Sequence, residues 1–182
     1  MQTRARDESG FGLLELVMAT VMLNIGILAI IAAFSSGNTA LGRASRISTA
    51  SALADTQIEV YRGLTFNNIV FITAEWTAAL ADSHYRADTV YVDHMQGTLV
   101  YPKGLVTAVT TCPASVPTTA CDPSYTTTGA DRRSYRVDTY LYHDAPTGGL
   151  QVKTITVVVR DAADPTRSFA RVSSTFDSST NP

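Results

Sequence analysis

The 182-residue chain is 45% hydrophobic, carries a formal net charge of −2 and contains only two cysteines. Its 14 lysines and arginines are scattered and form no basic stripe, so composition argues against direct nucleic-acid binding. If the first third of the chain is one long helix, roughly 120 residues remain, which is enough for a single domain with one modest core.

The chain begins with a short polar segment, residues 1–10, that contains two arginines and ends in Gly10. An ordinary secretory signal has an apolar core of ~7–15 residues followed by a small-residue cleavage site. Here the apolar run is longer and the acidic residues Asp7 and Glu8 precede it, so the match to such a signal is poor. A secreted protein cleaved near Ala32–Ser36 is the alternative.

A long apolar segment follows, and a single carboxylate stands at its start. From Leu16 to Phe34 no residue is charged, and Thr20 and Asn24 are the only polar side chains. A helix of that length extends roughly 28 Å, about the thickness of the hydrocarbon core of a bilayer. Glu15 directly precedes this segment, where an ionised carboxylate is costly, up to ~2.5–3.5 kcal/mol at the centre of a bilayer. In isolation, Glu15 would be interpreted as an interfacial residue of an uncleaved membrane anchor.

Residues 35–64 continue with helical periodicity. Apolar and small residues recur at steps of three, four or seven, whereas most charged residues lie off this stripe. The stripe consists of Ala40, Ala44, Ile47, Ala54, Ile58 and Tyr61. We therefore predict one helix over about residues 11–64, apolar all round in its first half and amphipathic in its second.

Residues 65–182 have the pattern of a globular β-rich domain. The sequence predicts a short helix around 74–81, strands around 89–94 and within 97–111, a loop over 112–131, and strands over 133–143, 150–160 and 168–176. Pro102 limits the second of these strands to an edge or an end of a sheet. The last three strands are joined by short turns, so they should form an antiparallel meander with one face that needs cover. The amphipathic half of the helix can supply it, which gives an α+β fold with a long N-terminal helix packed on a C-terminal antiparallel sheet.

The two cysteines, Cys112 and Cys121, are separated by eight residues. This spacing excludes a CxxC redox or zinc pair, and no nearby His or Cys completes a metal site. In an exported domain the pair would form a disulfide that closes a small loop. The other interpretation is two free, buried thiols.

The stretch GFGLLELVMATVMLNIGILAI resembles the N-terminal signature of type IV pilins and of the pseudopilins of type II secretion. That signature is a short polar leader ending in Gly, then Phe, three residues, Glu and about twenty apolar residues. Gly10, Phe11 and Glu15 occupy these positions. The resemblance covers only about residues 9–34, and Gly12 departs from the usual Thr or Ser.

The resemblance implies cleavage between Gly10 and Phe11 by a prepilin peptidase, with N-methylation of Phe11. Cleavage would leave a positive α-amine four residues from Glu15, so the carboxylate would gain a partner on its own or an adjacent subunit. The implied organisation is a leader (1–10), a membrane and filament-core helix (11–34), an amphipathic continuation (35–64) and a globular domain (65–182). Other pilin or pseudopilin subunits, the prepilin peptidase and an inner-membrane assembly platform are the implied partners.

By the same resemblance, the protein would be a single-pass protein of the cytoplasmic membrane with an extracytoplasmic C-terminal domain, and a surface or periplasmic filament subunit after assembly. The cysteine pair precedes the meander, which favours a minor pilin or minor pseudopilin. The sequence gives no reason to expect catalytic residues, a metal or a cofactor, because His84, His94 and His143 have no metal-ligand spacing. The alternative from another class is a membrane-anchored extracytoplasmic binding domain or enzyme unrelated to pili.

Overall fold

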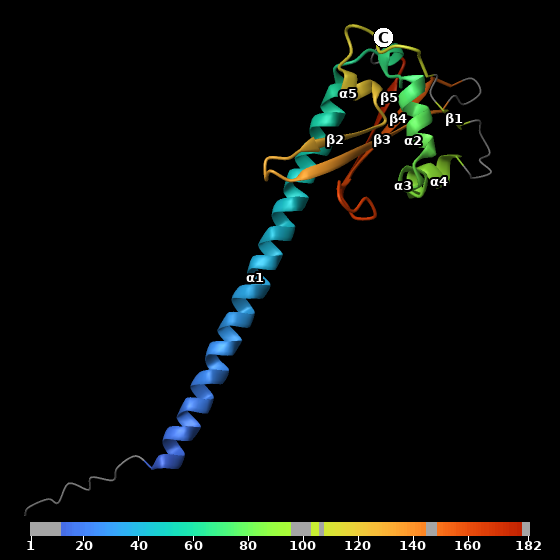
Figure 1. The fold of residues 1–182 in the computed structure, drawn as a ribbon. Coiled ribbons are helices and arrows are strands. Elements are labelled where there is room, and N and C mark those ends of the chain that lie inside the picture. Colours follow the sequence, from blue (N-terminus) through green and yellow to red (C-terminus); the bar gives the residue numbers. More distant parts are fainter. Residues whose placement is uncertain (1–11, 96–102, 106–107, 145–148, 180–182) are drawn as a thin grey trace, which may run out of the picture. The chain divides into compact units, whose positions relative to one another are not determined.

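The N-terminal helix α1 runs unbroken over 50 residues, Leu13–Arg62, which confirms the prediction of one long helix (Figure 1). The structure is a computed structural model that describes residues 12–95, 103–105, 108–144 and 149–179. Two units divide the chain, residues 1–44 and residues 45–182. The helix therefore contributes its first part to one unit and its last part, from Ser45, to the other.

The second unit combines short helices with an antiparallel sheet. Its elements after α1 are η1 (Phe66–Asn68), α2 (Thr73–Ala81), α3 (Ser83–Arg86), α4 (Thr89–Met95), β1 (Lys103–Leu105), α5 (Thr118–Cys121), β2 (Ser124–Thr128), β3 (Ser134–Asp144), β4 (Val152–Asp161) and β5 (Ser168–Asp177). Sequential pairing of β3, β4 and β5 confirms the predicted meander. On its other edge β3 pairs with both β1 and β2, which gives the sheet the order β1-β3-β4-β5 with β2 beside β3. The fold is α+β, as predicted.

The strand predicted over 89–94 is wrong, because these residues form helix α4. Its local sequence, TVYVDH, is rich in β-branched and aromatic residues and so favours a strand. Asp88 overrides this preference, since its Oδ1 accepts a hydrogen bond of 2.9 Å from the backbone N–H of Val90, in the manner of an N-cap. Helix α4 then places Val90 and Tyr91 against the sheet, so tertiary packing selects the helical form.

The loop predicted over 112–131 is also wrong in part, because it contains α5 and β2. Turn-forming residues on both sides obscure the short β-favouring run Tyr125–Thr128. That run becomes a strand because the edge of β3 offers it partners, from Ser124 opposite Asp138 to Thr128 opposite Ser134. The strand predicted within 97–111 is described only in part: β1 is a short strand that pairs with β3 alone, and Pro102 lies outside the described residues.

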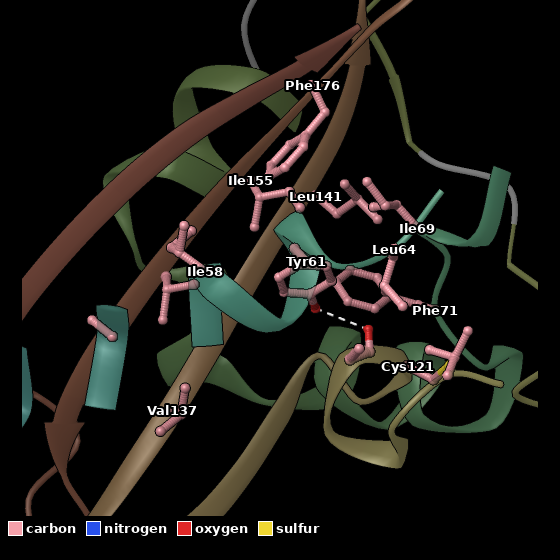
Figure 2. Close-up of a cluster of buried hydrophobic side chains, with 14 of the residues drawn as sticks. Ile58, Tyr61, Leu64, Ile69, Phe71, Cys121, Val137, Leu141, Ile155 and Phe176 are labelled. Atoms are coloured by element: carbon pink, nitrogen blue, oxygen red, sulfur yellow. Dashed lines mark hydrogen bonds between the residues drawn. The ribbon is translucent and has the colours of Figure 1, made fainter. Parts of the chain in front are cut away.

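One face of the sheet packs against the C-terminal part of α1. Figure 2 shows Ile58 and Tyr61 of α1 beside Val137, Leu141 and Ile155 of the strands, all of them buried. Burial along α1 begins at Ala50 and continues at Ala54, Gln57, Ile58 and Tyr61. Of the predicted stripe, Ala40, Ala44 and Ile47 are exposed. The amphipathic half of the helix therefore covers the sheet over its last three turns.

The opposite face of the sheet is covered as well, which the sequence did not predict. Tyr85 of α3 and Tyr140 of β3 are buried with their rings stacked, 4.4 Å between centroids. The Tyr85 hydroxyl donates to the Thr139 carbonyl at 2.6 Å, and the Tyr140 hydroxyl donates to the Tyr85 carbonyl at 3.0 Å. This exchange satisfies both hydroxyls, so the pair can be buried at little cost. The sheet is thus an inner layer between α1 and the α2–α4 segment.

A lysine lies within the inner core. Lys153 of β4 is only 7% exposed, and its ammonium donates to the carbonyls of Phe66 and Ile69 at 2.6 and 2.9 Å. The same nitrogen lies 4.4 Å from the centroid of the Phe66 ring. These contacts connect the segment that follows α1 to the beginning of the inner strand β4. Burial lowers the pKa of Lys153 to about 8.

Because of this lowered pKa, we expect the stability of the folded chain to rise with pH between about 8 and 10. In that window the unfolded lysine, with its ordinary pKa of about 10.4, holds a proton that the folded lysine has released. The free energy of unfolding of the wild type, minus that of Lys153→Met, should therefore increase by up to about 1.4 kcal/mol per pH unit in this window. Urea unfolding of the full chain in detergent measures it. Lys103→Met, which changes the other lysine, should give no such slope, and a flat difference for Lys153→Met would contradict the assignment.

Candidate functional site

The first part of α1 presents apolar side chains on all sides. By length and composition α1 is able to cross a membrane once, since an 18-residue window has a mean hydropathy of 2.5 with none of it buried. The large apolar side chains from Leu13 to Phe34 are between 47% and 82% exposed. An apolar surface of this extent requires a lipid or protein environment. We call residues 13–34 the apolar segment.

Glu15 is the only charged residue between Leu13 and Gly42. It lies in the first turn of α1, where its backbone N–H donates to the Gly12 carbonyl at 2.9 Å, and its side chain is exposed. The positive end of the helix dipole favours a carboxylate here. Gly10 and Phe11 lie outside the described residues, so the structure does not place the predicted cleavage site relative to Glu15.

The two uncharged polar side chains in the apolar segment bond to their own helix. The Thr20 hydroxyl donates to the Val17 carbonyl at 2.8 Å, and the Asn24 amide donates to the Thr20 carbonyl at 2.9 Å. Such back-bonding satisfies donors that would otherwise be unpaired in lipid. This back-bonding lets Thr20 and Asn24 lie in an apolar environment without another partner. Glu15 differs, because it is the one charged residue of the segment and its carboxylate needs a partner from elsewhere.

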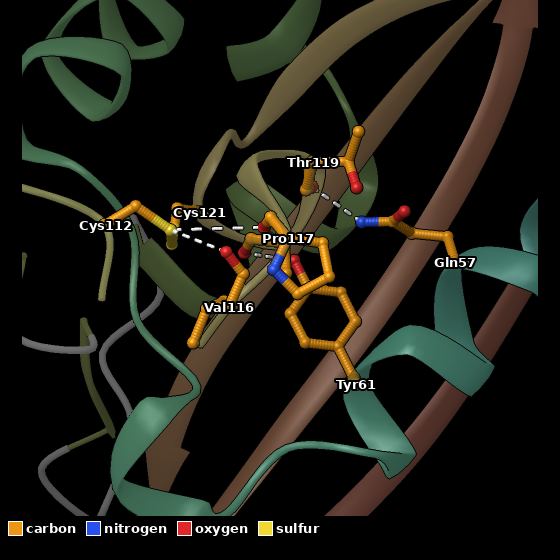
Figure 3. Close-up of a disulfide and its surroundings, with 8 residues drawn as sticks. Gln57, Tyr61, Cys112, Val116, Pro117, Thr119 and Cys121 are labelled. Carbon is orange, nitrogen blue, oxygen red and sulfur yellow. Dashed lines mark hydrogen bonds between the residues drawn. A yellow bond between two sulfur atoms is a disulfide. The ribbon is translucent and has the colours of Figure 1, made fainter. Parts of the chain in front are cut away.

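The predicted cysteine pair is brought together near the C-terminal end of α1. Cys112 and Cys121 form a disulfide with Cα atoms 5.9 Å apart. Figure 3 shows the loop they close beside Gln57 and Tyr61 of α1, where the Gln57 amide donates to the Thr119 carbonyl at 2.8 Å. The disulfide loop therefore contacts the part of α1 that packs on the sheet.

A buried network of charges, which the sequence does not predict, lies on the face of the sheet covered by α3 and α4. Asp138 of β3 is fully buried, and it accepts hydrogen bonds from Arg136 at 2.7 Å and from Arg160 at 3.0 Å. Arg160 also pairs with Asp88, the residue that caps α4. We call this set, completed by Asp82, Arg136 and Arg171, the charge network.

The outer acids of the charge network tie the helices to the sheet. Asp82 caps α3 and pairs with Arg136 at 2.6 Å, and Asp88 accepts two hydrogen bonds from Arg171, at 2.9 and 2.8 Å. Burial opposes ionisation of both acids, but the hydrogen bonds from the neighbouring arginine and from backbone N–H groups, together with the arginine charge, outweigh it, so the pKa of each is lowered. Lowered carboxyl pKa values stabilise the fold above about pH 4, and that contribution is lost as the pH falls through them.

The alternation of apolar and polar side chains along β3 is the one sequence pattern that bears on the charge network. It places Arg136 and Asp138 on the same face of the strand, which sequence alone would assign to solvent. Asp82 lies 54 residues before its partner Arg136, and Asp88 lies 72 and 83 residues before its partners Arg160 and Arg171. The arginines and aspartates of the charge network satisfy one another's hydrogen-bonding groups. We therefore interpret the network as structural, because it holds α3 and α4 on the sheet.

The described part of the chain has no group of three or more His, Cys, Asp or Glu side chains that could hold a metal ion. His84 is exposed, and His94 stacks on Tyr142 with 4.0 Å between ring centroids. No family model matches the chain, and no curated protein or solved structure matches it either. The exposed apolar segment, with Glu15 in its first turn, is the candidate functional site.

Proposed function

We propose that the chain is a structural subunit, of the minor class, in a filament of the type IV pilus or type II pseudopilus kind. The observation that carries this proposal is the exposed apolar segment with one carboxylate in its first turn, continuous with a helix that packs on an α+β domain. A soluble protein would bury such a segment. A simple membrane anchor does not require a carboxylate at that position.

Processing gives Glu15 its partner in this proposal. Cleavage between Gly10 and Phe11 by a prepilin peptidase creates an α-amine on Phe11, and methylation keeps its positive charge. Four residues are about one helical turn, so this amine can reach Glu15 of its own helix or of a neighbouring one. An unpaired charge in a low-dielectric surround costs several kcal/mol, so pairing between subunits draws packed helices into one axial register.

The subunit has two environments in succession. Before assembly the apolar segment crosses the cytoplasmic membrane, and the domain from Ser45 onward lies outside the cytoplasm, where the Cys112–Cys121 disulfide can persist. An assembly platform in the inner membrane then transfers the helix from lipid to the apolar surfaces of other pilin or pseudopilin helices. The function is structural, without a catalytic step or cofactor.

Processing is the most direct test. Mass spectrometry of protein from the native membrane should find a mature chain that begins at Phe11 and carries one added methyl group. Gly10→Val should block cleavage, because a side chain before the bond hinders the extended backbone in a narrow protease site.

Gly12→Ala is the matched control for this experiment. A Cβ added at Gly12 meets nothing within 4 Å in the described residues, and the position lies beyond the cleaved bond, so this variant should be processed normally. A mature chain that begins at Met1 would favour the membrane-anchored binding domain or enzyme. A chain that begins at Ser36 would indicate a secreted protein. Either result would exclude the filament subunit.

A further inference from the structure

The short helix α5 supplies three backbone acceptors in a row to the rest of the domain. The Thr119 carbonyl accepts from the Gln57 amide at 2.8 Å, and the Ala120 carbonyl accepts from the Tyr61 hydroxyl at 2.9 Å. The Cys121 carbonyl accepts from the backbone N–H of Ile72 at 2.9 Å. The last carbonyls of any helix have no partner within it. Here two of the three are satisfied by side chains of α1.

Both α1 donors are committed to this contact. Gln57 is 2% exposed and Tyr61 is 0% exposed, so neither can turn to water if the carbonyls move away. The Oε1 atom of Gln57 also accepts a hydrogen bond of 2.9 Å from the Tyr125 hydroxyl, which fixes the orientation of the amide. Burial raises the pKa of Tyr61, so its hydroxyl keeps the proton that it donates. Two of the hydrogen bonds that hold α1 in its docked position therefore depend on the position of α5.

Helix α5 cannot hold that position by its own helicity. It has four residues, Thr118–Cys121, whereas isolated helices shorter than roughly 12–15 residues are marginal in water. Its last residue, Cys121, is fully buried and forms the disulfide with Cys112 nine positions earlier. The cross-link thus anchors the same end of α5 that presents the three carbonyls.

We propose that the Cys112–Cys121 disulfide is a redox-controlled clamp on α1. In the oxidised chain it holds the carbonyls of Thr119 and Ala120 against Gln57 and Tyr61. When a dithiol donates two electrons and two protons, the S–S bond breaks, two thiols form, and the dithiol becomes a cyclic disulfide. Helix α5 then loses its anchor, and residues 50–61 of α1 separate from the sheet. The clamp operates whether or not the chain assembles into filaments.

Hydrogen exchange of the full-length chain in detergent micelles, read by mass spectrometry with and without dithiothreitol, tests the clamp. Reduction should raise the exchange rate of residues 50–61 on the order of tenfold or more. The reason is that loss of a disulfide in a small loop should shift the equilibrium between docked and separated α1 by at least that factor. Strand β4 at the centre of the sheet should change by less than about twofold. The Cys112→Ala/Cys121→Ala double variant should exchange like the reduced wild type and should not respond to dithiothreitol.

A second pair of variants separates the clamp from general stabilisation. In the oxidised chain, Gln57→Ala should raise exchange in residues 50–61 while the disulfide stays intact. The matched variant Asp55→Ala, at an exposed position of the same helix, should not. An equal rise in β4 and in residues 50–61 on reduction would overturn the proposal, because the disulfide would then stabilise the whole domain. No rise in residues 50–61 would overturn it as well.

Discussion

Asp138→Ala should lower the free energy of unfolding by about 3–5 kcal/mol, the range measured when one partner of a buried ion pair is removed. The carboxylate of Asp138 is fully buried and accepts from Arg136, Arg160 and the Ser124 hydroxyl, at 2.7, 3.0 and 2.7 Å. Removing it leaves two guanidinium groups, with side chains only 13% and 8% exposed, without their common acceptor. Urea unfolding followed by tryptophan fluorescence measures the loss.

The chain's single tryptophan, Trp76, is well placed for this measurement. It stacks on Phe71 at 5.6 Å and meets the edge of Tyr85 at 6.2 Å, so it contacts the packing on both sides of the sheet. Asp93→Ala, at an exposed position on α4, is the matched control and should change stability by less than about 0.5 kcal/mol. A loss below about 1 kcal/mol for Asp138→Ala would mean that the two arginines find water, and that the charge network contributes little.

Glu15→Ala should abolish incorporation into filaments and leave folding and processing intact. The residue belongs to the unit formed by residues 1–44, so the domain from Ser45 onward should fold as before. Membrane insertion should be equal or slightly better, because a charge is removed from an apolar helix. The Phe11 amine of a neighbouring helix would lose its counter-charge, which costs several kcal/mol in a low-dielectric filament core. The amount of tagged protein in sheared filament fractions should fall more than tenfold.

Thr20→Val is the matched control in the same apolar segment. The Thr20 hydroxyl bonds within its own helix, and valine keeps the shape of the side chain, so this variant should be incorporated normally. A Glu15→Ala protein that is processed and stable but stays in the cytoplasmic membrane supports the assembly role. Normal incorporation of Glu15→Ala would show that the carboxylate is an incidental interfacial residue.

Patterns that are local in sequence gave correct predictions. The long helix, the short helix α2 and the three-strand meander rest on periodicities of 3.6 and 2 within single segments, and the structure has all of them. The prediction failed where distant residues decide the local conformation. Helix α4 depends on Asp88, whose arginine partners lie 72 and 83 positions later, and β2 depends on the free edge of β3. The Asp88 cap is itself local in sequence, but its arginine partners and the edge of β3 lie outside any window around residues 89–94 or 124–128.

The functional residues likewise include some that a local motif predicts and some whose contacts depend on distant parts of the chain. Gly10, Phe11 and Glu15 were identified from a motif, and in the proposed function they act between a chain and its peptidase or its neighbours. A single folded chain does not have to bring them together. The contact of the disulfide loop with Gln57 and Tyr61 could not be predicted, because the partners are 62 and 59 residues apart and α5 is too short to produce a helical pattern.

The topology of the second unit also sets an order of events during folding. Strands β3, β4 and β5 follow one another closely in sequence, so their pairing closes only short loops. The contacts of α1 and its following turn close loops of 59 to 87 residues, which cost more chain entropy and form more slowly. Since synthesis proceeds from the N-terminus, the helix is made first and docks last. Until the final strand is complete, the buried face of residues 50–61 is an apolar surface that must be kept from other partners.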